Sequence, residues 1–316
     1  MDNVTVTVLM PVFNGGKYIA EAIDSVIRQS YTHYELLIID DGSTDNTLEV
    51  IRSFEDARIR VISQSNAGVA AALNKGLEHA KGKYIARFDA DDVCLPSRLQ
   101  VQVQFLDTHP DYIVVGSEAE YISEENDHLF HFKSYAHQNN EIQKTLYTHC
   151  PFIHSSVMFR KEVVTANGGY LELAHNMEDY LLWIQISKAG KFHNLAQPLI
   201  KVRFNSASVT IDEKWRGKRF RTLKQGILKR GTLSAEESTE LLTIIRKQNS
   251  QKIKQGSYYA ICGKKFLVNN YQPRKAREHL KKAIDIYPLR LDNYALLLAS
   301  FFPYGFIRWL HKKTHP

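Results

Sequence analysis

Short apolar runs of strand length alternate with helical patterns through Phe88, and this alternation constrains the fold more than any other feature. Strands are predicted at residues 4–10, 35–40, 59–63 and 84–88. Helices fill the sequence between them; from residue 19 to 27 the apolar positions recur at the helical i, i+3, i+4 spacing. Strands and helices that alternate through short turns predict an α/β domain, with a mostly parallel sheet covered by helices on both faces.

Polar residues follow the end of each predicted strand. The four clusters are Phe13-Asn14, Asp40-Asp41, Gln64-Ser65-Asn66 and Asp89 with Asp91. Because the carboxyl ends of parallel strands share one edge, we expect the clusters to lie together where open α/β sheets bind ligands. This favours a nucleotide-type ligand, although neither the Gly-x-Gly-x-x-Gly turn nor the Gly-x-x-x-x-Gly-Lys-Ser/Thr loop is present.

The fourth cluster is an acidic turn, in which a buried strand ends in three carboxylates. Asp89 and Asp91 are two residues apart, so on an extended segment their side chains point the same way and can reach one cation. A hard divalent ion is commonly held by one or two carboxylates together with substrate phosphates. The alternative is a solvated turn in which Asp92 caps the next helix; the three neighbouring clusters favour the cation.

Three segments carry a resemblance to a known family. PVFNGGKYIAEAIDSVIRQSYTHYELLIIDDGSTDNT, NAGVAAALNKGLEHAKGKYIARFDADD and SRLQVQVQFL resemble the opening of family 2 glycosyltransferases, and HSSVMFRKEVV, GGY and NMEDYLLWIQISKAG continue the likeness more loosely. The resemblance implies the Rossmann-like, type A fold of nucleotide-diphosphosugar transferases. It also implies inverting transfer from a nucleotide diphosphosugar with Mn²⁺ or Mg²⁺. The Gln-x-x-Arg-Trp motif of processive members is absent, which favours one sugar per encounter.

The resemblance assigns the donor pocket to residues that follow the predicted strands: Pro11, Phe13, Asp40, Asp41, Asn66, Gly68, Arg87, Asp89 and Asp91. Of these, Pro11, Phe13 and Asp41 would surround the nucleotide base, with Asp40 in support. Asn66 and Gly68 would lie beside the donor and Arg87 near the nucleotide. Asp89 would contact the ribose, or the ion through water, and Asp91 the ion itself. The alternatives are that Gly68 only begins a helix and that Arg87 only pairs with an acid.

A second acidic cluster begins a predicted helix. Asn176 is a plausible cap, which places Glu178 and Asp179 in the first turn, where the helix dipole favours carboxylates. The structural alternative is that the two acids only stabilise the helix dipole, as acidic residues in a first turn commonly do. The resemblance, however, implies that Asp179 is the catalytic base and that Glu178 orients the acceptor hydroxyl.

The chain departs from the family pattern at Asn205, where the family often has a histidine that ligates the metal. Asn is a weaker ligand for Mg²⁺ or Mn²⁺. The third metal ligand is therefore either His154 or the donor phosphates together with water. A histidine beside Ser155 and Ser156 and an apolar strand is more often structural.

Charge divides the sequence in two. Residues 1–212 carry 18 Lys and Arg against 27 Asp and Glu, and residues 213–316 carry 23 against 7. We therefore predict a catalytic domain at 1–212, with 1–117 for the donor and 118–212 for the acceptor, followed by a basic α-helical region at 213–316. Residues 118–140 are polar, as in an insertion or lid, and their three histidines (His128, His131 and His137) lack a metal spacing.

The basic region contains two recognisable patterns. Residues 257–290 resemble one tetratricopeptide-like helical pair. The apolar run at 294–307 is shorter than the ~20 residues that span a bilayer, which leaves an interfacial membrane helix or a packed terminal helix. A solvated basic face is the simpler alternative for the whole region. Without a recognised motif, its positive charge does not indicate nucleic acid.

These patterns predict a cytoplasmic enzyme, peripheral at the inner face of the cell membrane. The three cysteines (Cys94, Cys150 and Cys262) are far apart and fit a reducing compartment, and the first residues lack the features of a secretory signal. The expected reaction moves a hexosyl or N-acetylhexosaminyl group, from UDP by resemblance, to a glycan or polyprenyl-diphosphate-linked acceptor in surface polysaccharide synthesis. The alternatives are a sugar-phosphate nucleotidyltransferase and a non-catalytic sugar-nucleotide or glycan-binding module. The oligomeric state stays open.

Overall fold

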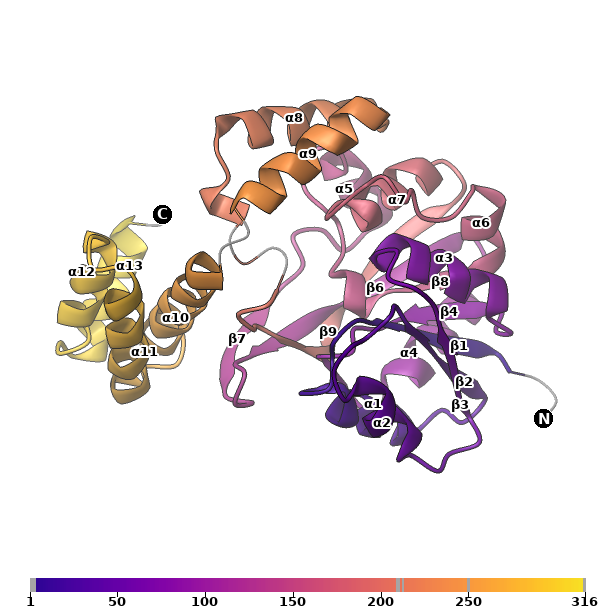
Figure 1. Ribbon diagram of the computed structural model, residues 1–316, viewed down its shortest axis with the longest axis horizontal. Helices are drawn as coiled ribbons and strands as arrows, with labels where there is room; N and C mark the ends of the chain where they lie inside the picture. Colours follow the sequence, from indigo (N-terminus) through magenta and orange to yellow (C-terminus); the bar gives the residue numbers. More distant parts are fainter. Residues whose placement is uncertain (1–3, 209–210, 212, 249–250, 315–316) are drawn as a thin grey trace. The chain divides into compact units, whose positions relative to one another are not determined.

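The computed structural model describes residues 4–208, 211, 213–248 and 251–314 (Figure 1). The chain forms two compact units, and it passes between them more than once. The first unit contains Met1–Ala119, Phe132–Val202 and Thr222–Glu240. The second contains Glu120–His131, Arg203–Arg221 and Leu241–Pro316.

The first unit opens with the predicted alternation of strands and helices. The four parallel strands are β1 (Val6–Val12), β2 (Tyr34–Asp40), β3 (Ile59–Ser63) and β4 (Tyr84–Arg87). Every residue of β1, β2 and β4 is buried, as expected for strands that are covered on both faces. The predicted α/β fold is therefore confirmed. The helices of this part are α1 (Ile19–Ile27), α2 (Thr47–Arg52) and α3 (Val69–His79).

Antiparallel strands extend this sheet on the far side of β4. The strand order is β3-β2-β1-β4-β8-β6-β9-β5, and β7 pairs with β6. β8 runs antiparallel to both β4 and β6, and β5 runs antiparallel to β9. These strands are β5 (Val93–Cys94), β6 (Tyr112–Ile122), β7 (His128–Phe132), β8 (Met158–Arg160) and β9 (Lys191–Arg203).

The alternative for the acidic turn, a helix cap at Asp92, is wrong. Asp92 caps no helix, because the chain continues into β5, and α4 (Arg98–Thr108) begins only after Ser97. Much of the segment 118–140 is regular, since β6 continues to Ile122 and β7 pairs with it. The remaining short helices are α5 (Asn139–Thr145), η1 (His154–Ser156), α6 (Lys161–Ala166), α7 (Glu178–Ile186) and η2 (Glu213–Trp215).

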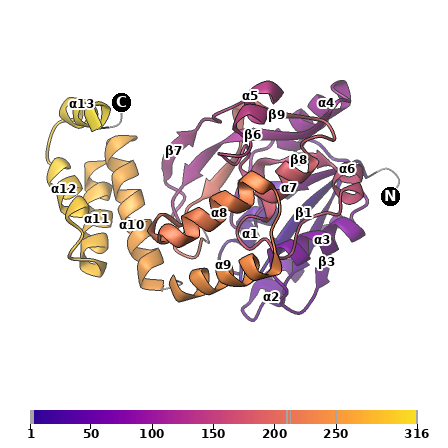
Figure 2. The ribbon, with the colours of Figure 1, turned by 90° about the horizontal axis from the view of Figure 1, so that it is seen from above.

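Helices make up the rest of the chain. The predicted helical pair is present as α10 and α11, and α11 also packs against α12 (Figure 2). Gly263 of α10 permits the close approach of α11, because a Cβ there would lie 2.7 Å from the side chain of Leu280. Within the described residues, no helix has both the length and the apolar character needed to cross a membrane. These helices are α8 (Lys218–Arg230), α9 (Ala235–Gln248), α10 (Gln251–Val268), α11 (Pro273–Ile286), α12 (Leu291–Ala299) and α13 (Tyr304–Thr314).

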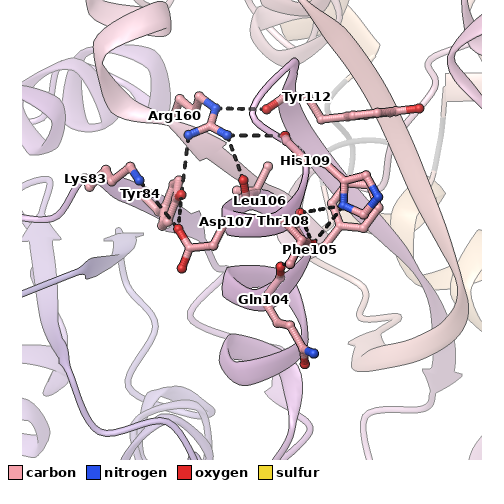
Figure 3. Close-up of polar contacts among 10 residues, drawn as sticks. All are labelled: Lys83, Tyr84, Gln104, Phe105, Leu106, Asp107, Thr108, His109, Tyr112 and Arg160. Atoms are coloured by element: carbon pink, nitrogen blue, oxygen red, sulfur yellow. Dashed lines mark hydrogen bonds and ion pairs between the residues drawn. The ribbon is translucent and has the colours of Figure 1, made fainter.

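Arg160, at the end of β8, anchors the antiparallel strands to the end of α4 (Figure 3). Its buried guanidinium donates to the carbonyl oxygens of Tyr112 at 2.9 Å, Leu106 at 2.8 Å and His109 at 3.4 Å. The last carbonyls of a helix have no partner within the helix. Arg160 therefore satisfies groups that would otherwise be buried without hydrogen bonds.

We expect Arg160→Leu to lower the free energy of unfolding by about 3 kcal/mol, because a hydrogen bond to a charged group contributes about 1.5–3 kcal/mol and the carbonyls would lose their donors. Urea denaturation would measure the loss. Arg52→Leu, on the exposed side of α2, is the matched control and should change stability by no more than about 0.5 kcal/mol. Equal losses in the two variants would contradict the anchoring role.

Candidate active site

The loops that follow β1 and β2 are bonded to each other. Asn14 has a φ of 52°, its backbone N–H donates to Ser43 Oγ at 2.9 Å, and its Oδ1 accepts from the N–H of Thr44 at 2.8 Å. Phe13, the residue before Asn14, is 51% exposed. These bonds hold the Phe13 ring in solvent at the carboxyl end of the sheet.

Asp41 connects the end of β2 to the start of α3. Its carboxylate is buried and accepts from Gln64 Nε2 at 2.7 Å, from the N–H of Ala67 at 2.9 Å and from the N–H of Gly68 at 2.8 Å. Gly68 has a φ of 93°, which only glycine adopts readily. The structure thus brings Asp41 and Gly68 into direct contact, whereas Asn66, in the same loop, is exposed.

The other two residues predicted for the base pocket belong to the strands themselves. Pro11 lies in β1, paired with Ile39 of β2, and is buried. Asp40 is the last residue of β2, and its Oδ1 accepts from the N–H of Ser43 at 3.1 Å. Both are therefore buried at the strand ends that lead into the loops of Phe13 and Asp41.

The acidic turn follows β4. Asp89, Asp91 and Asp92 each offer a carboxylate oxygen, and these oxygens lie within 4.8 Å of one another. Asp92 is buried, and Asp89 and Asp91 are partly exposed. The backbone N–H of Asp89 donates to Ser155 Oγ at 3.0 Å, which fixes the start of the turn. An all-oxygen, negatively charged donor set fits Mg²⁺ or Mn²⁺ and disfavours softer metals.

Arg87 is a buried cation at the base of this turn. Its guanidinium pairs with the carboxylate of Asp89, and its carbonyl oxygen accepts from Arg98 Nη2 at 2.7 Å. Burial alone would lower the pKa of Arg87, but the charge and hydrogen bond of Asp89, together with the charges of Tyr170 and Asp92, raise that pKa. Among the described residues, Arg87 Nε has no hydrogen-bond acceptor. A buried guanidinium with an unused donor is suited to an anionic ligand.

The second acidic cluster begins α7. Burial raises the pKa of Glu178 to about 7, and the charge of Asp179 adds to the rise. Burial also raises the pKa of Asp179, against the opposing effects of the Tyr180 N–H, which donates to Asp179 Oδ1 at 2.7 Å, and of the Arg87 charge. Arg87 therefore acts electrostatically on both acidic clusters. Within the described chain, Glu178 Oε2 has no hydrogen-bond partner.

The predicted cap of this helix is wrong. The residue before α7 is Met177, it makes no side-chain capping bond, and Asn176 has a φ of 61°. Asn tolerates this left-handed conformation better than most residues, so Asn176 shapes the turn and does not cap the helix.

Sequence reasoning missed Cys150 as a site residue. Its Sγ lies 3.6 Å from Asp179 Oδ2 and 3.5 Å from the carbonyl oxygen of Phe152, so its single S–H can donate to either. Burial, with the charge of Asp179, raises the pKa of the Cys150 thiol well above its ordinary value. An isolated cysteine 29 residues from Asp179 gives no sequence signal for this contact.

The candidate third ligands make other contacts. His154 Nε2 lies 3.0 Å from the hydroxyl of Tyr170, and burial together with the charge of Arg87 holds the pKa of His154 well below its ordinary value. Asn205, in the second unit, is buried, and its Oδ1 accepts from the N–H of Ala207 at 2.8 Å. Both side chains thus make structural hydrogen bonds.

The three histidines of the segment 118–140 each contact a carboxylate. His128 Nε2 and His131 Nδ1 lie 2.7 Å from the two oxygens of Glu120, and His137 Nε2 lies 3.0 Å from Glu118 Oε1.

Comparison with known proteins shows the family to which the chain is related. The family model Glycosyl transferase family 2 matches residues 7–167. EpsE of Bacillus subtilis (strain 168), named as a glycosyltransferase, is 35% identical over 214 residues, which cover 64% of this chain and 73% of EpsE. The amylovoran biosynthesis glycosyltransferase AmsE of Erwinia amylovora is 29% identical over 215 residues, which cover 66% of this chain and 80% of AmsE. An uncharacterized glycosyltransferase of Rickettsia bellii is 31% identical, but the chain spans only 29% of its length.

Solved structures share the fold. S. aureus TarS 1-349 in complex with UDP is 16% identical with a TM-score of 0.56, over 98% of this chain and 92% of that one. The mannosyltransferase PcManGT from Pyrobaculum calidifontis, in complex with GDP-Man and Mn²⁺, is 19% identical with a TM-score of 0.53, over 94% and 86%. At these identities the likeness concerns the fold alone.

Proposed function

Because the chain belongs to glycosyltransferase family 2, we propose that it is an inverting, non-processive enzyme that moves a sugar from a nucleotide diphosphosugar to a glycan hydroxyl. One observation carries the proposal. The buried cation Arg87 pairs with Asp89 in the carboxylate cluster after β4, and its charge also acts on the Glu178–Asp179 pair. Asp41, at the end of β2, accepts a hydrogen bond from the loop before α3. Such an arrangement can bind an anionic leaving group and accept a proton within one site.

The donor nucleotide would lie across the ends of β1 and β2. Phe13 offers an exposed ring for the base, with Pro11 and Asp40 behind it, and Asp41 holds the loop of Asn66 and Gly68 in place. Arg87 Nε would donate to the diphosphate. We propose UDP as the nucleotide; a TarS structure of the same fold contains UDP-GlcNAc, while PcManGT contains GDP-Man.

Asp91, with Asp89, would hold Mn²⁺ or Mg²⁺. The fit rests on three carboxylates whose oxygens lie within 4.8 Å of one another. When bound, such an ion supplies positive charge to the leaving diphosphate. Asp91 is the carboxylate that the family resemblance assigns to the ion, and Asp89, which pairs with Arg87, would assist it.

Asp179 would act as the general base. It takes the proton of the acceptor hydroxyl as that oxygen attacks the anomeric carbon, and the nucleoside diphosphate departs from the opposite face, which inverts the configuration. The raised pKa of Asp179 makes it a better proton acceptor, and the charge of Arg87 limits that rise and so favours the ionised form. Glu178, with a pKa of about 7, would hydrogen-bond the acceptor hydroxyl through its unpartnered Oε2.

The proposed acceptor is a glycan on a polyprenyl diphosphate, at the inner face of the cell membrane, in surface polysaccharide synthesis. The relative AmsE is named for amylovoran biosynthesis, which supports a polysaccharide product. In this proposal residues 1–212 perform the chemistry, with 1–117 for the donor and 118–212 for the acceptor. Residues 213–316 form a basic contact region, and the enzyme is cytoplasmic and peripheral.

A thermal-shift panel of UDP-, GDP- and dTDP-sugars, with and without Mn²⁺, tests the donor. A ligand at 100 times its dissociation constant adds about 2.7 kcal/mol of stability. For a unit of this size each kcal/mol raises Tm by about 2–4 °C. We therefore expect UDP-sugars to raise Tm by about 5 °C or more with Mn²⁺, and clearly less without it. Phe13→Ala is the control and should weaken the shift. A larger shift with GDP-sugars would overturn the UDP assignment.

A further inference from the structure

The C-terminal helices expose an unusual concentration of apolar side chains. Nine of the eighteen exposed large hydrophobic side chains in the described part of the chain lie between Leu289 and Trp309. Isolated exposed hydrophobics are ordinary, but apolar side chains gathered in one short segment point to an interaction site. We call these nine side chains the apolar patch: Leu289, Leu291, Tyr294, Leu298, Phe301, Phe302, Tyr304, Phe306 and Trp309.

On α12 the patch follows helical spacing. Leu291, Tyr294 and Leu298 recur at i, i+3 and i+7, so they lie on one face of the helix, and Leu298 is 66% exposed. The buried residue of this helix is the polar Asn293. α12 therefore packs Leu296 and Ala299 against the core of the second unit and also presents an apolar face to solvent.

The turn between α12 and α13 continues the patch in aromatic residues. Every residue from 301 to 306 is exposed. The rings of Phe302 and Phe306 lie 4.8 Å apart between centroids, and those of Phe306 and Trp309 lie 5.9 Å apart. Ile307, by contrast, is 3% exposed and packs into the core of the second unit. The fold thus anchors α13 through Ile307 and holds the aromatic row outside.

Charge identifies the kind of surface that fits this patch. Residues 251–316 carry 13 Lys and Arg against 3 Asp and Glu. Arg277 borders the patch, with its guanidinium 4.8 Å from the centre of the Phe301 ring, and Arg308 is exposed on α13. Two copies of this positive region would repel each other, whereas an anionic surface would attract it. Aromatic and leucine side chains with a basic border are typical of elements that lie in the headgroup region of a bilayer.

We infer that the apolar patch docks the protein on an anionic lipid bilayer, with Phe302, Phe306 and Trp309 entering the headgroup and upper acyl region and the neighbouring Arg and Lys side chains on lipid phosphates. The inference deepens the proposed function by naming the surface that meets the membrane. It rests on the proposed function only for the reason why the protein would bind a membrane. Vesicle binding needs neither donor nor acceptor, so the inference and the proposed reaction can fail separately.

The test is sedimentation of the full chain with vesicles of phosphatidylcholine alone or with about 30% phosphatidylglycerol. We expect binding to the anionic vesicles, weaker binding to the neutral ones, and clear weakening at about 0.5 M NaCl. Phe306→Ser with Trp309→Ser should weaken binding at least about tenfold, because two anchoring rings are lost. Tyr135→Ser with Tyr147→Ser, two exposed aromatics of the first unit, is the matched control and should bind as the unchanged protein does.

Tryptophan fluorescence locates the contact. In a Trp215→Phe protein the remaining tryptophans are the buried Trp183 and the exposed Trp309, so quenching by brominated lipid should report Trp309. Absence of binding to anionic vesicles, equal binding by the Phe306/Trp309 double variant, or absence of quenching would each overturn the inference. So would sedimentation velocity showing a dimer that the double variant abolishes, since the patch would then join two copies of the chain.

Discussion

Asp179→Asn is expected to abolish sugar transfer while leaving nucleotide binding within about twofold of the unchanged protein. General-base assistance contributes about 10²–10⁴ in rate, and an amide cannot take the proton. The substitution keeps the shape of the side chain and an oxygen that can accept the Tyr180 N–H. Initial rates with a labelled UDP-sugar measure the first effect, and calorimetry with UDP and Mn²⁺ measures the second.

Glu178→Gln is the matched control for this prediction. It retains an oxygen and a donor that can orient the acceptor hydroxyl, so we expect a loss of about tenfold, well short of the loss for Asp179→Asn. The rate of the unchanged enzyme should fall as pH drops through the pKa of Asp179, because the protonated acid cannot accept a proton. If Asp179→Asn lowered UDP affinity and kept its rate at saturating donor, Asp179 would belong to the donor site.

Asp91→Ala is expected to remove Mn²⁺ binding and, with it, most donor affinity and transfer. The substitution takes one carboxylate from a cluster of three, and it is the carboxylate that we assign to the ion. Each tenfold loss of affinity corresponds to about 1.4 kcal/mol, and we expect at least a hundredfold loss for Mn²⁺. Electron paramagnetic resonance of free Mn²⁺ measures the affinity without any assay of transfer.

Asp91 gives a cleaner test than Asp89. Asp89 pairs with the buried Arg87, so removing Asp89 would leave an uncompensated cation and would confound ion binding with loss of stability. Asp24→Ala is a suitable control, because Asp24 lies on α1 and, within the described residues, forms its ion pair with Arg28 on the surface. Unchanged Mn²⁺ affinity in Asp91→Ala would assign the ion to other oxygens.

Local sequence was sufficient for most of the first unit. The residues of β3 and α1 were predicted with their observed bounds, and β2 and β4 within one residue at their ends, because hydrophobic periodicity is a local property of the chain. Prediction from local sequence failed where one residue pattern is compatible with two local structures. Asn176 is a residue type typical of helix caps but adopts a left-handed turn, and Asp92, for which a helix cap was the alternative, leads into β5.

By itself, then, the sequence determined the α/β class, the parallel strands and the edge of the sheet where the acidic turn lies. Only the tertiary structure decided that β8 runs antiparallel between β4 and β6, that Arg87 pairs with Asp89, and that Cys150 reaches Asp179. The physical reason is the separation along the sequence between the residues that interact. Strand and helix formation depends on neighbours a few residues apart, whereas the pKa of Glu178 or Asp179 depends on burial and on charges that distant segments bring together.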